Sequence, residues 1–427
     1  MNKQLFISIA KIAGVVFALY LFLVGINGLS SGIKHLTQPD VVEVGDMVQN
    51  KAKIDGINKK VWMLVEDINY NEDGQLVYRC DYKVEGISEK FDVQESKVKM
   101  VASSTFVNTT SSSILALFIG IFATVLFQSS STTTSLIVGM VSSGVVSLTA
   151  SIPMIMGANI GTTVTNTLVS IGHIRRGNEF KRAFAASTVH DFFNLMAVII
   201  MFPLEMSTHF IERSATAMGI FFFGRVSTED AFKSPIKAAI KWGSSHVESL
   251  SGGNDILYII ISVVITFFML YFIVKLLRSL VLEKVETFFD QYIFKTPLRG
   301  IIFGMILTIM VQSSSITTST IVPLAGAGVL SLRQIYPFTL GANIGTTVTA
   351  LLASLTLNVT AMVAAFTHLL FNLYSIVLIY MNPLLRDIPI KLANGIAELS
   401  VRNKFYPFIY LFIVFFLIPF FIIFFGR

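Results

Sequence analysis

Long apolar runs separated by short polar segments fill most of the chain. A membrane-spanning helix needs about 20 mostly apolar residues, and the first run, Leu5–Leu29, is long enough. No small-residue cleavage site follows it, so we predict a retained helix rather than a signal peptide. The pattern predicts a polytopic membrane protein, with further apolar blocks at Ile114–Phe127, Ile152–Ile171, Phe192–Leu204, Ile256–Val274, Ile301–Val311, Ile335–Leu357, Val363–Ile379 and Tyr406–Phe425.

One segment, residues 39–104, interrupts this pattern. Between Asp40 and Lys99 it holds 13 acidic and 9 basic residues, whereas the whole chain carries a net charge of +6. Turn residues separate stretches that are rich in β-branched, aromatic or alternating residues, which favour strands. We therefore predict a small β-rich aqueous domain inserted after the first helix, and we expect it outside the membrane. Its predicted strands are Val61–Ile68, Gln75–Tyr82 and Lys97–Val101.

Composition agrees with a protein solvated by lipid. Hydrophobic residues make up 53% of the chain and charged residues only 14%, against roughly 25% charged residues in soluble domains. The mean hydropathy is +0.71. No run of Lys and Arg is long enough to suggest a nucleic-acid patch. The single cysteine, Cys80, excludes an internal disulfide framework and any cysteine-based zinc or iron–sulfur site within one chain.

An internal repeat is the most informative feature of the sequence. Gln-Ser-Ser-Ser occurs at Gln128–Ser131 and again at Gln312–Ser315. The nine residues Gly157–Thr165 recur unchanged as Gly341–Thr349. Both pairs are 184 residues apart, so the motifs belong to one duplicated unit. Duplicated halves with Gly-rich interruptions are typical of secondary transporters, in which the two halves form the binding site between them.

Each repeat continues into a second shared segment. His190–Asn194 pairs with His368–Asn372 after a six-residue shortening. Asp191 has no acidic twin, because Leu369 takes the equivalent position. An acid within the membrane is a functional candidate, although Asp191 could instead orient His190 or lie near the interface. We expect the two histidines to be structural rather than proton carriers.

Loop charges predict opposite orientations for the two repeats. Lys and Arg concentrate in the cytoplasmic loops of membrane proteins, which places the basic segments His173–Arg182, Lys275–Arg299 and Arg386–Lys404 inside. The first repeat then begins after the external insert and ends at an external loop. The second repeat begins and ends at basic loops. We therefore predict two inverted repeats.

The repeated motifs are rich in uncharged oxygen groups. Hard cations such as Na⁺ need several oxygen ligands, and hydroxyls, amides and free carbonyls supply them without fixed charge. Glycine and short polar residues favour breaks in a helix, and a broken helix presents N–H groups to anions at one end and carbonyls to cations at the other. The alternatives are local: a membrane Ser or Thr usually bonds to a nearby carbonyl, and Asn159 or Asn343 could be a turn residue.

Together, the paired Gln-Ser-Ser-Ser motifs, the Gly-Ala-Asn-Ile-Gly-Thr-Thr motifs and Ala186–Asn194 resemble the type II sodium–phosphate cotransporters, in particular their prokaryotic members. The resemblance covers about Ile114–Pro203 and Pro297–Pro383, together with the first helix. It implies an all-α polytopic membrane protein with two inverted repeats, each with a re-entrant helical hairpin and broken helices. It also implies that the Gln-Ser-Ser-Ser segments lie at hairpin tips around phosphate and sodium.

Carried over residue by residue, the resemblance implies a set of site residues. Electrogenic relatives have an Asp near the position of Ser147, so serine there resembles the electroneutral branch, and Asp191 is a further candidate. The phosphate candidates are Gln128, Ser129, Ser130, Ser131, Gln312, Ser313, Ser314 and Ser315. The sodium candidates are Gln128, Thr134, Asn159, Thr162, Thr163, Gln312, Thr318, Asn343, Thr346, Thr347 and Thr349.

We therefore predict a sodium-coupled symporter that takes up inorganic phosphate, as the divalent anion, by alternating access. The alternatives are a sodium-coupled transporter of another oxyanion such as sulfate, and a membrane sensor or scaffold acting through the β-insert. No enzyme is expected, because GxSxG, HExxH, Walker A and paired acids within the repeats are all missing. We expect no cofactor beyond Na⁺ as coupling ion. The expected partners are phosphate, sodium and membrane lipid, without nucleic acid, and the oligomeric state stays open.

The expected location is the plasma membrane, or the inner membrane in a Gram-negative cell. The predicted organisation along the chain is a first transmembrane helix at 1–38, the β-rich insert at 39–104, transport repeat 1 at 105–204, an external loop at 205–253, a transmembrane helix with a cytoplasmic linker at 254–296, transport repeat 2 at 297–383, and a cytoplasmic loop with the last transmembrane helix at 384–427.

Overall fold

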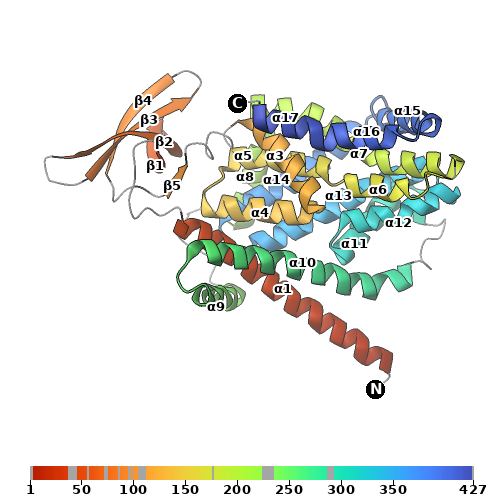
Figure 1. Ribbon diagram of the computed structural model, residues 1–427, viewed down its shortest axis with the longest axis horizontal. Coiled ribbons are helices and arrows are strands. Elements are labelled where there is room, and N and C mark those ends of the chain that lie inside the picture. Colours follow the sequence, from red (N-terminus) through yellow and green to blue (C-terminus); the bar gives the residue numbers. More distant parts are fainter. Residues whose placement is uncertain are drawn as a thin grey trace.

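The computed structural model describes residues 3–36, 46–54, 57–71, 76–84, 87–94, 98, 100–103, 112–175, 177–223, 235–285 and 293–425. These residues are mostly helical, and one β-sheet lies at one end of the molecule (Figure 1). The chain is a multi-pass membrane protein, as its hydropathy pattern predicts. Five of the described helices are long and apolar enough to cross a membrane: Ile7–Ile33, Gly177–Thr208, Asp255–Leu276, Val359–Tyr380 and Tyr406–Phe425.

The sheet lies within the segment for which strands are predicted. Its five strands are antiparallel and follow the order β4-β3-β2-β1-β5, so the chain forms a meander whose fifth strand returns to pair with the first. The strands are β1 (Asp46–Ile54), β2 (Ile57–Tyr70), β3 (Leu76–Val84), β4 (Ile87–Gln94) and β5 (Met100–Ser103).

One face of the sheet carries a small apolar core. It includes Val48, Met63, Tyr78 and Val93, and Cys80 lies fully buried among them. Burial raises the pKa of the Cys80 thiol to about 12, and the nearby Asp92 carboxylate adds to the shift. Because an inert, protonated thiol packs like a small apolar side chain, Cys80 is a core residue of the insert.

The first helix, α1 (Lys3–Leu36), packs along α10 (Asp255–Val285) at one side of the helical part (Figure 1). Gly25, Gly28 and Gly32 face α10, and a Cβ at Gly25 would lie 2.9 Å from the carbonyl oxygen of Ser262. Small residues at such an interface let two membrane helices approach closely. The helix α9 (Pro235–Leu250) joins this group, where the Tyr20 hydroxyl donates to the carbonyl of Ala239.

The first two helices of each half repeat the same lengths at the same spacing. In each set a 15-residue helix is followed, after one Gln and one Ser, by a 14-residue helix. The first half comprises α3 (Ser113–Phe127), α4 (Ser130–Ser143), α5 (Leu148–Gly161), α6 (Val164–Ile171) and α7 (Gly177–Thr208). The second half comprises α11 (Pro297–Val311), α12 (Ser314–Ala327), α13 (Leu332–Ser354), α14 (Val359–Ser375) and the π-helix η3 (Ile376–Tyr380).

Glycines set the closest helix contacts in both halves. In the first half, a Cβ at Gly157 would overlap the carbonyl oxygen of Leu117 on α3. In the second half, a Cβ at Gly341 would overlap the carbonyl oxygen of Ile301 on α11. Gly157 and Gly341 are 184 residues apart, and so are Leu117 and Ile301. The halves therefore share a backbone-to-backbone contact that only glycine permits.

Helix breaks at the repeated nine-residue motif are predicted, and the two halves differ there. In the first half α5 ends at Gly161, and α6 begins at Val164. In the second half α13 continues unbroken through the whole motif. The expectation of a break was therefore wrong for the second copy. Because the motif glycines lie against a neighbouring backbone, close packing rather than helix breaking explains their presence there.

Two segments expected to be loops contain helices. The expected external loop at 205–253 holds the end of α7, then α8 (Phe210–Phe223) and α9. The expected cytoplasmic loop after residue 384 holds α15 (Ile388–Arg402), which buries Ala393 and Ala397 and packs against α7. Their charges lie on the polar faces of amphipathic helices. The chain closes with α16 (Tyr406–Phe412), η4 (Ile413–Leu417) and α17 (Ile418–Phe425), and the short η2 (Ile293–Lys295) precedes α11.

Candidate functional site

Each Gln-Ser-Ser-Ser segment forms the tip of a helix–turn–helix unit. Gln128 has φ 54° and Gln312 has φ 55°, and both end their helix in the left-handed region. Among the described non-glycine residues, only His209 shares a positive φ. A long side chain rarely adopts this conformation, so the two tips reverse the chain by the same uncommon turn. We refer to Gln128–Ser129 and Gln312–Ser313 as the hairpin tips.

The serines after each tip glutamine start the next helix. The Ser129 hydroxyl accepts from the backbone N–H of Thr132 at 3.2 Å, and the Ser313 hydroxyl accepts from Ile316 at 3.3 Å. The first helical residues are buried: Ser130, Ser131, Ser314 and Ser315. A helix N-terminus presents N–H groups without intrahelical partners and favours anions. The helix start that follows each tip therefore places donor groups and hydroxyls inside the protein.

Both tip glutamines are held by the same two contacts. The Gln128 amide donates to the carbonyl of Val125 at 2.9 Å, and its oxygen accepts from the Thr165 hydroxyl at 3.1 Å. The Gln312 amide donates to Ile309 at 2.7 Å, and its oxygen accepts from Thr349 at 2.8 Å. The two shared motifs of each half thus meet in space. This contact explains why they recur together.

The second hairpin also contacts the first half. Thr318 donates to the Asn166 side-chain oxygen at 2.9 Å, and Ser319 donates to the same oxygen at 3.0 Å. The Ser315 hydroxyl donates to the carbonyl of Thr162 at 3.4 Å. We call residues 162–166 the junction segment. Since Thr165 binds the first tip, this segment touches both hairpins.

A chain of hydrogen bonds between a histidine and three asparagines joins the two halves. The His190 ring nitrogen Nε2 lies 2.6 Å from the side-chain oxygen of Asn343. The Asn343 amide donates to the Asn194 side-chain oxygen at 2.8 Å, and the Asn194 amide donates to the carbonyl of Asn159 at 2.8 Å. All four residues are buried. Asn343 is thus a bridge between α13 and α7, whereas the Asn159 side chain donates within its own helix, to the carbonyl of Ile155.

Asp191 is a buried acid next to this network. One of its carboxylate oxygens accepts from the Tyr410 hydroxyl at 3.0 Å and from Thr167 at 3.4 Å. The other oxygen has no hydrogen-bond partner among the described residues. A carboxylate with one free, buried oxygen is costly unless a cation or proton neutralises it, which keeps Asp191 a functional candidate.

Six of the seven threonines predicted as sodium ligands bond back to their own helices, whereas Thr349 donates to Gln312. The Thr134 hydroxyl donates to the carbonyl of Ser130, and the single Thr318 proton is shared between the carbonyl of Ser314, 2.7 Å away, and the Asn166 oxygen. This outcome matches the local alternative, but a donating hydroxyl keeps lone pairs that can bind a cation. The motif contacts are Thr162 to Ala158, Thr163 to Ile160, Thr346 to Ala342 and Thr347 to Ile344.

The equivalent residues of the second half lack such a network. Both ring nitrogens of His368 and the side-chain oxygen of Asn372 are buried without hydrogen-bond partners in the part of the chain that the structure describes. The Asn372 amide donates only to the carbonyl of His368, at 2.9 Å. The histidine and asparagine pair therefore has a different role in each half.

Ser147 lies away from these contacts. Its hydroxyl accepts from the backbone N–H of Ala150 at 3.1 Å and caps the N-terminus of α5. Its repeat counterpart, Ser331, likewise caps α13, together with Gln334. Ser147 therefore has a helix-capping role that accounts for a serine at this position.

Four residues of the site were missed by sequence reasoning. Thr165 could have been found, because it is the repeat counterpart of the predicted Thr349. Asn194 lies in the shared His-x-x-Phe-Asn segment, which also signals it. The repeat does not point to Asn166 or Tyr410. The second-half position equivalent to Asn166 is Ala350, and Tyr410 lies outside both repeats. Only the tertiary structure places these two at the site.

Comparison with known proteins defines the class of this fold and site. The chain matches the Na⁺/Pi-cotransporter family over residues 94–226 and 265–381, which include both hairpins, the junction segment and the His190–Asn343 bridge. The chain belongs to this family, as the motif resemblance predicts, and it is not an enzyme. No solved structure matches the chain.

Several curated proteins are similar to this chain. Sodium-dependent phosphate transport protein 2B of Homo sapiens is 32% identical over 399 residues, covering 71% of this chain and 57% of the relative. Sodium-dependent phosphate transport protein 2A of Ovis aries is 33% identical over 380 residues, covering 71% and 59%. The 2B protein of Bos taurus is 33% identical over 454 residues, covering 84% and 63%. The chain thus spans about three fifths of the length of these relatives.

Proposed function

We propose that this chain is a sodium-coupled symporter that takes up inorganic phosphate by alternating access. The observation that carries the proposal is the meeting of both hairpins at the junction segment, through Gln128, Ser315 and Thr318. Substrate sites of secondary transporters form where two repeats meet at interrupted helices. The names of the relatives supply the choice of sodium and phosphate.

The N-termini of α4 and α12 are the proposed phosphate site. Two helix N-termini and the hydroxyls of Ser129–Ser131 and Ser313–Ser315 offer N–H and O–H donors to an oxyanion. The tip residues themselves carry no positive charge. Bound sodium therefore has to offset the charge of the anion, which links the two ligands energetically.

Sodium has oxygen ligands close to the same place. The Gln128 and Gln312 side-chain oxygens, the carbonyl of Thr162 and the motif hydroxyls are uncharged ligands of the kind that a hard cation accepts. The free oxygen of Asp191 is a charged one. We assign the sodium sites to this group and leave the number of ions to measurement of charge per phosphate.

Coupling follows from ligand linkage. If sodium raises the affinity for phosphate, phosphate raises the affinity for sodium by the same factor. A tenfold sodium gradient contributes about 1.4 kcal/mol per ion. Two ions would therefore support roughly hundredfold accumulation of divalent phosphate without net charge movement.

Alternating access would come from relative motion of the two halves. Each half contributes one hairpin, and the helix contact through Gly157 or Gly341 keeps each half rigid within itself. With the basic segments inside, the halves lie in opposite senses across the plasma or inner membrane, with each hairpin re-entering from its own side and the β-insert outside.

Uptake of ³²P-phosphate into liposomes that contain the purified chain tests the proposal. An inward sodium gradient should drive uptake, and potassium in its place should not. Gln312→Ala should abolish uptake, whereas Gln334→Ala, which changes a half-buried capping glutamine away from the hairpin tips, should retain it. Excess sulfate tests the other oxyanion. No sodium-dependent uptake by folded, inserted protein would contradict phosphate symport, and inhibition by sulfate would shift the substrate assignment.

A further inference from the structure

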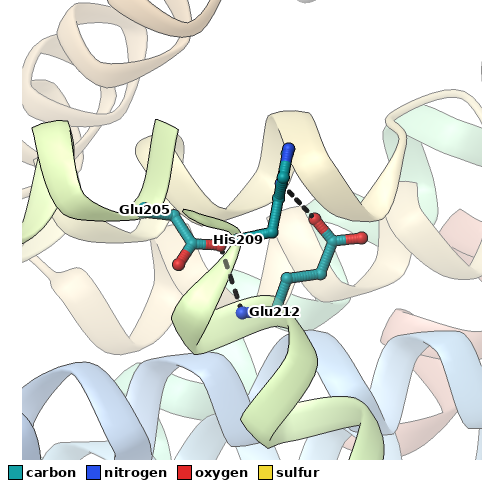
Figure 2. A group of neighbouring side chains, drawn as sticks. All are labelled: Glu205, His209 and Glu212. Carbon is teal, nitrogen blue, oxygen red and sulfur yellow. Dashed lines mark hydrogen bonds and ion pairs between the residues drawn. The ribbon is translucent and has the colours of Figure 1, made fainter. Parts of the chain in front are cut away.

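A histidine and two glutamates meet at the corner between α7 and α8, away from the hairpins. Glu205 lies in the last turn of α7, His209 is the connecting residue, and Glu212 lies in the first turn of α8 (Figure 2). One ligand atom from each residue lies within 4.8 Å of the other two. The proposed transport mechanism uses none of these three residues.

The geometry of the corner suits a metal ion. His209 Nδ1 lies 3.2 Å from the Oε2 atom of Glu212 (Figure 2). Two ligands of a tetrahedral zinc ion, each about 2.0–2.1 Å from the metal, lie roughly 3.3 Å apart. The uncommon backbone of His209, with φ 51°, turns its ring toward the first turn of α8. The pair therefore has nearly the separation that two zinc ligands require.

Glu205 completes the set from the buried side. Glu205 is only 1% exposed. Its two carboxylate oxygens accept from the backbone N–H groups of Ile211 at 2.6 Å and Glu212 at 3.1 Å. Each carboxylate oxygen has more than one lone pair, so these contacts orient Glu205 without exhausting it. Hydrogen bonds of this kind are what positions a metal-binding carboxylate.

Charge also favours a cation at the corner. Two carboxylates lie together here, one of them buried, and the only ion pair that either makes among the described residues is the one between His209 and Glu212. An imidazole can neutralise at most one carboxylate. A divalent ion bound between Nδ1 of His209 and the two carboxylates balances both negative charges.

We propose that Glu205, His209 and Glu212 bind a divalent transition-metal ion, with Zn²⁺ as the first choice because it accepts imidazole and carboxylate ligands together. The ion would join the end of α7 to the start of α8, and the remaining coordination positions would hold water. Glu212 also accepts from the Thr149 hydroxyl of α5 at 3.2 Å. The site would therefore fasten α5, α7 and α8 together at one corner.

Cobalt titration of the untagged full chain in detergent tests this site, because Co²⁺ bound to such ligands absorbs visible light and Zn²⁺ does not. We expect one Co²⁺ per chain, displaced by Zn²⁺, and a higher melting temperature with Zn²⁺. His209→Ala and Glu212→Gln should each weaken Co²⁺ binding by about tenfold or more. His246→Ala, which removes a histidine bonded to the Trp242 carbonyl on α9, is the matched control.

Variants are compared only after size-exclusion elution and melting temperature without metal show a folded protein. Glu205→Gln is left out of the test because Glu205 also caps α8. A wild-type chain with no visible Co²⁺ absorption would overturn the proposal. So would a His209→Ala variant that binds Co²⁺ like wild type, or loss of binding in His35→Ala instead, since His35 lies near Glu248 and Asp255.

Discussion

The two halves share their backbone turns but differ in their polar contacts. Each tip has a glutamine in the left-handed conformation. Gln128 contacts the Val125 carbonyl and Thr165, and Gln312 contacts the equivalent Ile309 carbonyl and Thr349. The buried polar contacts, in contrast, differ between the halves. Nε2 of His190 and both ends of the Asn194 amide belong to a continuous hydrogen-bonded chain, and of these groups only Nδ1 of His190 is unpartnered in the described part of the chain. In the second half, both ring nitrogens of His368 and the side-chain oxygen of Asn372 are unpartnered among the described residues.

This difference shows that the duplicated halves keep the same backbone turns and glycine contacts, whereas their buried polar side chains have diverged. The hairpins and their glycine contacts have to match for the halves to fold alike. The acidic position is not constrained in this way, because Asp191 of the first half corresponds to Leu369 in the second half. The junction segment, with Asn166 in place of Ala350, receives the second hairpin. The first half is therefore the more polar partner in a shared site.

The largest expected effect is loss of the fold at the shared glycine contacts. Gly157→Ala and Gly341→Ala both place a Cβ onto a neighbouring carbonyl oxygen, and each should destabilise the protein by about 4 kcal/mol or more. Gly395→Ala on α15 is the control, because no atom lies within 4 Å of its Cβ; it should be neutral or slightly stabilising. Melting of detergent-purified protein measures this. If Gly341→Ala melted like the wild type while Gly157→Ala did not fold, the backbone contacts of the two halves would not be equivalent.

The next largest effect should distinguish the equivalent asparagines of the two halves by their loss of stability. Asn343→Ala removes the partner of both His190 and Asn194 and should cost about 3 kcal/mol, because two buried polar groups lose their hydrogen bonds. Asn159→Ala should cost about 1 kcal/mol, since its contact to Asn194 comes from the backbone carbonyl and survives. Denaturant unfolding in detergent compares the two variants. Equal losses would show that the amide chain does not bridge the halves.

Much of this comparison was open to prediction from the sequence. The constant offset of 184 residues predicted a duplicated unit, and the family resemblance placed the Gln-Ser-Ser-Ser segments at hairpin tips. Hydropathy predicted the membrane helices, and strand-like patterning between turn residues predicted the β-insert. Repeat arithmetic also points to Thr165 once Thr349 is chosen. These features depend on local sequence or on the duplication itself, so a single chain reveals them.

The asymmetric features were not predictable in the same way. The nine-residue motif is identical in both halves, yet the helix breaks after Gly161 and continues through Gly345. The broken copy has its Thr162 carbonyl bound by Ser315 and is followed by Asn166, which receives Thr318. Those contacts join residues more than 150 positions apart, so local propensity does not determine them.

A smaller, functional effect should follow from the acid that only one half carries. Asp191→Asn keeps the shape and an acceptor for Tyr410 and Thr167 but removes the charge. If Asp191 contributes to a sodium site, the sodium concentration for half-maximal phosphate uptake should rise about tenfold, which corresponds to about 1.4 kcal/mol. Tyr410→Phe should have a weaker effect in the same direction. Unchanged sodium dependence in a folded Asp191→Asn variant would assign the acid a structural role.

The smallest effect should be equal in the two halves. Thr165→Val and Thr349→Val each remove one hydroxyl that donates to a tip glutamine, at 3.1 Å and 2.8 Å. Each should cost about 1 kcal/mol, the usual contribution of one hydrogen bond. The double variant should cost about the sum, because sites without shared partners are additive. Unfolding of the two single variants and the double variant measures this. A double variant well beyond the sum would mean that the tips are coupled through the junction segment, and the two hairpins would then act as one unit rather than as two copies.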